Sequence, residues 1–458
     1  MIKRVALVLS VVSLFCGGAP LGPGRAAAQT NGARQTSPFV LPIVKRDSLL
    51  NGLQIIILEQ PGSGRVSTHL RIGSGAMFDL AGKGGLANVT ARMLLRGSSG
   101  LAPSGLANLA EETGLSVDIA AGWDSTDLKV SGPASELETI LDLIGRLVIS
   151  PTFDQKELDT LKTSLISDLK AAPAQDKETV RRTAIESVYG SHPYGRPWRG
   201  TVESLTAITR PDLTYYHNKF YLANISHLVI AGDATLDQVT KLARSKLGPW
   251  KKGDRVPATF RPPEPAVSRR LILINRADST VGMAAIAQIG YSRRADDYYA
   301  AAVMTELLKE TVKAPGASVE VEANPRVLAG PLVISASAPQ EQIAAVVESI
   351  LNEVGRFQSG GMPPEKIEAA KTRLVSQMAE RLRANEGSAE VILEIELYEL
   401  GRDYLLNYAT RINAVTPADL QKAAQSYLKP QSVAIAVAAT EEKVKEGLKK
   451  LGPVSVMK

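Results

Sequence analysis

The stretch that decides the fold is "AITRPDLTYYHNKFYLANISHLVIAGD", residues 207–233, because a related stretch occurs later in the chain. That second stretch is "AVTPADLQKAAQSYLKPQSVAIAVAAT", residues 414–440. Each reads as a helix followed by an apolar strand, and the two start 414 − 207 = 207 residues apart. Solenoid repeats have periods of about 20–50 residues, so this displacement indicates two domains of one fold.

The segments around this repeat predict strands and helices arranged in blocks. "LQIIILE" (53–59) and "VSTHLRI" (66–72) predict two strands paired through the turn "QPGSGR" (60–65). "PTFDQKELDTLKTSLISDLKAA" (151–172) predicts a helix, and "MPPEKIEAAKTRLVSQMAERL" (362–382) repeats it. The predicted fold class is therefore α+β, with two homologous domains that each pack helices on a mixed sheet.

The N-terminus predicts a secretory signal peptide. "MIKR" is a basic start, "VALVLSVVSLF" is an apolar run too short to span a bilayer, and "AAAQ" (26–29) offers a cleavage site. Phe15 directly before Cys16 disfavours a lipoprotein signal, so we expect a periplasmic or secreted protein without a lipid anchor. The expected organisation is a signal peptide (1–28), a flexible leader (29–47), an N-terminal domain (48–249), a Pro-rich linker (250–268) and a C-terminal domain (269–458).

Composition excludes several classes of function. The formal charge is +6, but the predicted signal peptide carries Lys3, Arg4 and Arg25 and no acid, so removing it leaves 6 − 3 = +3. That charge gives no case for nucleic-acid binding. Signal removal also takes away the only cysteine, which excludes disulfides, a thiolate nucleophile and cysteine-ligated metal. No later apolar run reaches the length of a transmembrane helix.

Four segments together resemble the insulinase/pitrilysin/mitochondrial-processing-peptidase family, over about residues 48–445. They are "NGLQIIILEQPGSGRVSTHLRIGSGA" (51–76), "GLANVTARMLLRGS" (85–98), "HPYGRPWRGTVESLTAITRPDLTYYHNKFYLANISHLVIAGD" (192–233) and the repeated second half. The resemblance implies paired α+β domains that form half of a clamshell chamber, and a zinc endopeptidase that cuts unfolded peptides. In the family, an H-x-x-E-H helix supplies two zinc ligands and a general base, and a distant carboxylate completes the metal site.

This chain departs from that motif at every position of the helix. Asn88 takes the place of the first His, Ala91 that of the Glu and Arg92 that of the second His, while Asp168 falls near the distant carboxylate. An amide is a poor zinc ligand, a guanidinium has no lone pair to donate, and a methyl group cannot accept a proton. We therefore predict no metal, no cofactor and no catalytic residue here, although the family binds zinc.

Two further expectations concern the same helix. Arg92 and Asp168 form, by hypothesis, an ion pair that fills the place of the metal. An ordinary amphipathic helix is the alternative, with Leu86, Val89, Met93 and Leu94 facing the core and Arg92 facing solvent or a cleft.

The second half departs from the family as well. The segment "LLKETVKAPGASVEVEAN" (307–324) lacks the Arg and Tyr with which, as the resemblance implies, active relatives hold the substrate backbone.

The sequence leaves three functions open. The first is a non-catalytic subunit of a periplasmic peptidase assembly, in which an active insulinase-like partner supplies the intact motif and both share an unfolded peptide substrate. The second is a stand-alone peptide-binding or envelope scaffold protein with no protease activity. The third is an enzyme with a relocated site, which no cluster of residues in the sequence supports.

Overall fold

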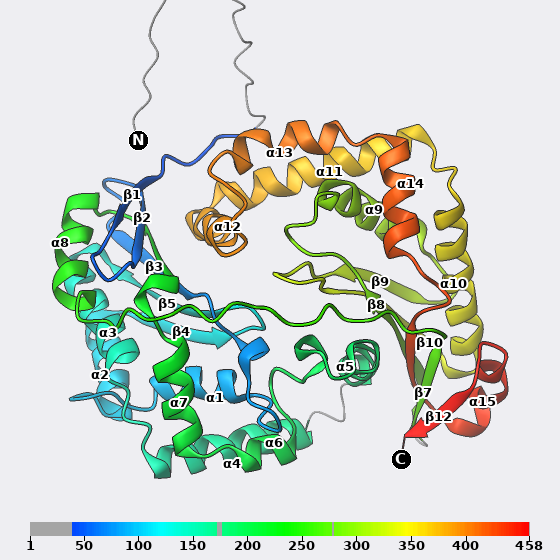
Figure 1. Ribbon diagram of the computed structural model, residues 1–458, viewed down its shortest axis with the longest axis horizontal. Coiled ribbons are helices and arrows are strands. Elements are labelled where there is room, and N and C mark those ends of the chain that lie inside the picture. The colour runs from blue at the N-terminus through cyan, green and yellow to red at the C-terminus, as the bar shows by residue number, and fades with distance from the viewer. Residues whose placement is uncertain (1–38, 172–175, 277–278, 458) are drawn as a thin grey trace, which may run out of the picture. The chain divides into compact units, whose positions relative to one another are not determined.

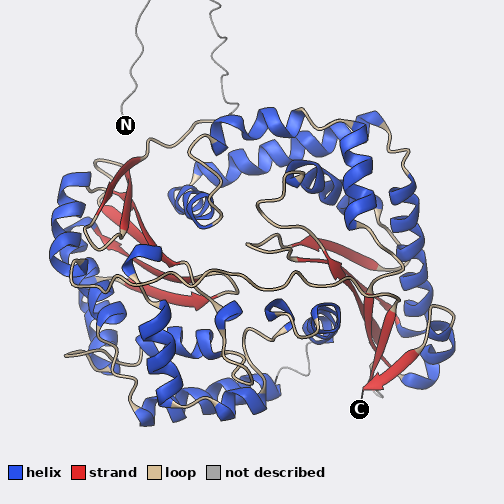
Figure 2. Cartoon of the chain, in the orientation of Figure 1, coloured by secondary structure: helices blue, strands red, loops and turns tan. Residues whose placement is uncertain are grey.

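Two six-stranded sheets organise the chain, one in each half (Figures 1 and 2). The structure is a computed structural model that describes residues 39–457 except 172–175 and 277–278. The predicted signal peptide and most of the predicted leader therefore lie outside the described residues. Below, the first half means the described residues up to 250 and the second half those from 269.

The two sheets share one topology in five of their six strands, and differ at one edge, where β1 is antiparallel to β2 but β12 is parallel to β7. In each, a pair of strands that are far apart in sequence runs parallel at the centre, and a three-stranded antiparallel set continues the sheet to its edge. In spatial order the first sheet is β1 (Lys45–Ser48), β2 (Gln54–Glu59), β6 (Ser226–Gly232), β3 (Arg65–Ile72), β5 (Thr126–Pro133) and β4 (Ser116–Ala121), and the second is β12 (Val454–Met457), β7 (Arg270–Asn275), β11 (Ala434–Ala439), β8 (Val281–Ile289), β10 (Pro331–Pro339) and β9 (Ser318–Ala323).

Helices account for most of the remaining structure, which confirms the α+β class. In the first half they are α1 (Leu86–Leu94), α2 (Pro103–Thr113), α3 (Leu137–Ile149), α4 (Gln155–Ala171), α5 (Asp176–Tyr189), α6 (Val202–Ala207), α7 (Arg210–Phe220) and α8 (Leu236–Leu247). In the second half they are α9 (Tyr298–Thr311), α10 (Ile343–Ser359), α11 (Pro364–Arg383), α12 (Asn385–Leu397), α13 (Tyr404–Asn413), α14 (Pro417–Tyr427) and α15 (Glu441–Lys449). Within the described residues, no helix is both long and apolar enough to cross a membrane.

The two repeated stretches begin their helices by the same local chemistry. The Asp212 carboxylate accepts a hydrogen bond from the Thr209 N–H (2.8 Å) at the start of α7, and Asp419 accepts one from the Thr416 N–H (3.0 Å) at the start of α14. Such reciprocal capping satisfies N–H groups that have no partner within a helix. The strands that follow, β6 and β11, occupy equivalent central positions in the two sheets.

The predicted pairing of the first two strands is wrong. β2 and β3 do not pair with each other, because β6 lies between them, parallel to β2 and antiparallel to β3. Six of the seven residues of β6 are buried, as a strand covered on both faces requires. Local turn residues could not reveal a strand that arrives from more than 150 residues away.

Several elements were not anticipated from the sequence. Lys45–Ser48 form the edge strand β1, although residues 45–47 were expected to belong to the flexible leader. The sequence reading also missed α6, α8, α12, α13 and the edge strand β12. Residues 251–266 are neither helix nor strand. The domain limits expected on either side of this segment remain a prediction.

Each half covers one face of its sheet with its own helices and borrows a helix from the other half for the opposite face (Figure 1). α5 of the first half packs on β8 and β11 of the second sheet, where Val180, Ala184 and Val188 meet a run of alanines. In return α12 of the second half packs on β6 and β3, where Ile392 and Leu393 meet apolar residues of the first sheet. The two halves are therefore joined by reciprocal burial of apolar surface.

A buried ionic network fastens α12 to the first sheet. Arg71 on β3 donates to Asp127 on β5 (2.6 Å) and to Glu390 on α12 (2.8 Å), and His69 lies 3.0 Å from Asp127. Burial works against the charge of Asp127, but Arg71 and His69 outweigh it and lower the pKa of that carboxyl to about 2. The stability that Asp127 contributes is thus present above its ordinary pKa of 3.8 and lost as pH falls from there towards 2.

We expect Arg71→Met to lower the free energy of unfolding by about 3 kcal/mol, because it removes the buried guanidinium and leaves the partly buried Asp127 carboxylate without it. Arg65→Met on the same strand is the matched control, since Arg65 is exposed and such changes cost about 0.5 kcal/mol or less. Urea denaturation followed by circular dichroism measures both. Equal losses for the two variants would contradict a role of the network in stability.

Candidate functional site

The helix that carries the degenerate motif, α1, starts at a tightly built turn. Gly85 precedes it with φ of 89°, and a Cβ there would lie 2.9 Å from the Gly200 backbone nitrogen, so only glycine fits. The Asp79 carboxylate accepts hydrogen bonds from the Gly85 N–H (2.7 Å) and the Ala87 N–H (2.8 Å). Burial raises the pKa of Asp79 to about 7, although these hydrogen bonds and Arg196 favour the ionised form.

The four motif positions differ in solvent exposure, two being buried and two exposed. Asn88 is 3% exposed and Ala91 is fully buried in the core of the first half, whereas Arg92 is exposed on α1 and Asp168 is exposed on α4. α1 and α4 do pack together, but through apolar residues such as Leu161 and Leu165. These positions therefore do not converge on one point.

The hypothesised ion pair between Arg92 and Asp168 is wrong. Among the described residues, no oxygen of Asp168 comes within 4 Å of the Arg92 guanidinium, and both side chains face solvent. The alternative expectation agrees with the structure, since Leu86, Val89, Met93 and Leu94 are all fully buried. An exposed ion pair gains little in water, which removes the driving force for these two side chains to meet.

The chemistry of this helix does not fit zinc. Asn88 offers at most an amide oxygen, Ala91 offers nothing, and Arg92 would repel a cation. The place of the general base is also closed, because Ala91 lies in a packed core that leaves no room for a carboxylate and a water. In the part of the chain that the structure describes, no three His, Cys, Asp or Glu side chains are placed to hold a metal ion.

The four histidines lie apart in separate structural settings. His217 bonds the Val148 carbonyl (2.9 Å), His69 belongs to the Arg71 network, and His227 lies 3.8 Å from Glu396. His192 accepts a hydrogen bond from the Tyr194 N–H (3.1 Å), and burial together with Arg196 lowers its pKa to about 4. His192 is therefore neutral at physiological pH and serves the turn that it caps.

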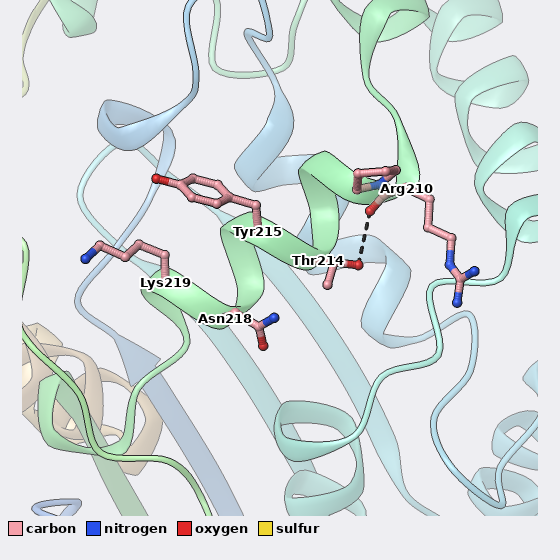
Figure 3. Close-up of a pocket in the computed structure, with 6 residues that line it drawn as sticks. Arg210, Thr214, Tyr215, Asn218 and Lys219 are labelled. Atoms are coloured by element: carbon pink, nitrogen blue, oxygen red, sulfur yellow. Dashed lines mark hydrogen bonds between the residues drawn. The ribbon is translucent and has the colours of Figure 1, made fainter.

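An open hollow of about 610 Å³ lies on α7, and Figure 3 shows its residues. Arg210, Thr214, Tyr215 and Lys219 all come from this one helix, and the only bond drawn between them joins the Thr214 hydroxyl to the Arg210 carbonyl (3.2 Å). Side chains on one helix face do not converge on a ligand, so this surface does not have the form of a site.

The sequence reading missed a buried junction between the halves. The Tyr194 hydroxyl donates to Asp124 (2.5 Å), and the Val327 N–H from the second half donates to the same carboxylate (3.0 Å). The Arg326 guanidinium lies 3.6 Å from the centroid of the Trp123 ring and 4.9 Å from that of Tyr194. The "HPYG" segment (192–195) drew attention to the loop that contains Tyr194. No local pattern of residues indicated that Arg326 would pack against the Tyr194 ring.

Comparison with known proteins identifies the class. A family model described as "Insulinase (Peptidase family M16)" matches residues 54–202, and one described as "Peptidase M16 inactive domain" matches residues 207–374. The chain belongs to the insulinase family, peptidase family M16.

Individual relatives are distant in sequence. An uncharacterized zinc protease of Mycobacterium leprae is 22% identical over 45% of this chain and 46% of its own length, so the match spans about half of that relative. The structure of a peptidase M16 inactive domain from Pseudomonas fluorescens is similar with a TM-score of 0.78 and 19% identity, covering 87% of this chain and 98% of that one. The periplasmic protease PqqL of Escherichia coli is similar with a TM-score of 0.71 and 14% identity, covering 92% of this chain and 52% of that one.

We expect Ala91→Glu to lower the free energy of unfolding by about 3–5 kcal/mol, because it places an unpaired carboxylate in the core. Arg92→Glu, the neighbouring position on the exposed face, should change stability by about 0.5 kcal/mol or less. Urea unfolding of both variants measures the difference. A stable Ala91→Glu protein would show that the space for a general base is still present.

The buried Asp79 predicts a pH dependence of stability. Its pKa rises from an ordinary 3.8 to about 7 on folding, so the folded state binds the proton more tightly. This group therefore lowers the free energy of unfolding as pH increases from about 4 to about 7. Asp79→Asn stays neutral and can still accept an amide hydrogen bond, so the difference in stability between pH 5 and pH 8 should shrink. A difference equal to that of the wild type would refute the assignment.

Proposed function

We propose that this protein is a non-catalytic member of the insulinase family that holds extended peptide segments for an active partner subunit. One observation carries the proposal: the helix in the position of the catalytic motif keeps its fold but buries Asn88 and Ala91 and exposes Arg92. Zinc hydrolysis needs ligands, an open coordination position and a base together, and these residues supply none of them. The likeness to a structure described as an inactive domain supports the same conclusion.

Peptide holding is supported by the edges of the two sheets. Within the described residues, β4 pairs only with β5 and β9 pairs only with β10, so each leaves one side of its backbone open. α1 packs beside β4, which places the first open edge next to the degenerate motif. Beside β9, a groove of about 560 Å³ runs along α9 past Tyr298 and Ala302. Open strand edges bind extended peptides through main-chain hydrogen bonds.

A partner subunit is supported by the size of the similar proteins. This chain corresponds to 52% of PqqL, and the first half of PqqL alone, solved as a separate structure, is covered completely. A protease with two such units in one polypeptide suggests that this chain supplies one unit of a similar pair. The signal peptide expected from the sequence, with the periplasmic location of PqqL, makes the periplasm the proposed site of this assembly.

The proposal predicts that the purified protein neither retains zinc nor cleaves unfolded casein. Elemental analysis after mild dialysis measures the metal, and mass spectrometry of the casein mixture measures cleavage. Zinc near one ion per chain together with casein cleavage would overturn the non-catalytic assignment.

Peptide holding has its own measurement. Hydrogen exchange with and without unfolded casein peptides should show slower exchange at residues 116–121 or 318–323, because strand addition satisfies their open backbone groups. Helix α7 (Arg210–Phe220), whose backbone N–H groups are bonded within the helix, serves as the internal reference. Unchanged exchange at both edges would remove the peptide-holding role.

A further inference from the structure

A partly enclosed cavity of about 100 Å³ lies outside the motif helix and both open strand edges. α5 forms one wall, residues 194–200 form another, and Trp123 closes part of the remainder. The Trp123 and Trp198 rings are 5.8 Å apart, and Leu169 and Ile185 add apolar surface. The cavity thus offers walls suited to a small group with an apolar stem.

Positive charge dominates the lining of this cavity. Four arginines line it, against two carboxylates, which leaves 4 − 2 = 2 positive charges in excess: Arg181, Arg182, Arg196 and Arg199 against Glu178 and Glu186. Arg182 lies 3.6 Å from Glu186, and Arg181 bonds Glu322 (2.9 Å). Arg199 lies over the Trp198 ring at 4.7 Å, and among the described residues it has no carboxylate partner. An anion in the cavity would supply one.

Buried donors behind the Trp123 wall also lack acceptors. Arg326 is 3% exposed and its guanidinium stacks on the face of Trp123, with Nη1 left without an acceptor although the charge of Asp124 acts on it. Arg326 does not itself line the cavity. The indole N–H of Trp123 is likewise buried without an acceptor. Leaving a buried donor unsatisfied costs about 1–3 kcal/mol, and more when the donor is charged, so two such donors side by side require an explanation.

We propose that this cavity binds a carboxylate. The inference rests on the proposed peptide-holding function, and the carboxylate is the C-terminus or an acidic side chain of the held peptide. A planar carboxylate matches guanidinium groups with two parallel hydrogen bonds. The cavity of about 100 Å³ exceeds the space that a single water molecule needs, which leaves room for a carboxylate on a short methylene stem.

Tryptophan fluorescence reports on this cavity directly. The chain has three tryptophans: Trp123 and Trp198 line the cavity, and Trp250 is buried elsewhere with its indole N–H bonded to the Tyr221 carbonyl (3.0 Å). The probes are N-acetyl-Ala-Leu with a free carboxylate, its C-terminal amide, and N-acetyl-Ala-Glu amide. We expect saturable fluorescence changes with the free acid or with the Glu peptide, and an affinity at least about tenfold weaker for the Leu amide, since a charged hydrogen bond contributes about 1.5–3 kcal/mol.

Three variants distinguish binding in the cavity from non-specific attraction of the probes to positive charge. Arg199→Gln should weaken binding about tenfold, because Arg199 is the exposed cation of the lining that no carboxylate neutralises. Trp123→Phe keeps an aromatic ring beside Arg326 and removes the indole N–H, and Trp198 still reports binding. Arg210→Gln on α7 is the matched control, since it removes an exposed arginine from another surface and should leave the affinity unchanged (Figure 3).

The outcomes are decisive in either direction. Preference for the free acid identifies a terminal carboxylate, and preference for the Glu peptide identifies an acidic side chain. Equal binding of the amide, equal competition by inorganic phosphate, or equal weakening by Arg210→Gln would overturn the carboxylate site. If casein peptides still slow exchange at the strand edges while no carboxylate probe changes the fluorescence, this inference fails and the proposed function stands.

Discussion

The exchange of one helix between the halves is the constraint on which the rest of the structure depends. A mixed sheet has two faces, and the helices of each half cover only one of them. α5 covers the second face of the second sheet and α12 covers the second face of the first sheet. Because each contact is completed by the other half, the described residues cluster as one compact unit.

The two exchanged contacts differ in their chemistry. α5 meets the alanines of β8 and β11, a flat surface that lets the helix approach closely. α12 combines an apolar contact with the ionic network around Arg71, in which the charges of Asp127 and Glu390 raise the pKa of the guanidinium despite its burial. An apolar contact tolerates small shifts, whereas a buried charge needs its partners at bonding distance, so the network fixes where α12 lies.

The helix of the degenerate motif lacks the metal-ligand residues, and two of its motif positions are also buried. Losing the ligands alone would leave a polar hollow beside α1, but Ala91 is packed within the core and Asn88 is nearly inaccessible. A close-packed interior resists the insertion of larger or charged groups. Features that could still bind a peptide therefore lie elsewhere, at the open edges β4 and β9 and in the arginine-lined cavity beside α5.

The sequence by itself determined the α+β class, the internal repeat, most helices and the chemical incapacity of the motif, because these follow from local periodicity and from residue type. Only the tertiary structure decided that β6 inserts between β2 and β3 and that Arg92 and Asp168 stay apart. It also decided that α5 and α12 each pack on the sheet of the other half. It also brought Arg326 to Trp123, which are separated by about two hundred positions in the chain. Such pairings depend on which buried surfaces meet after the chain has folded, and no local pattern of residues encodes that choice.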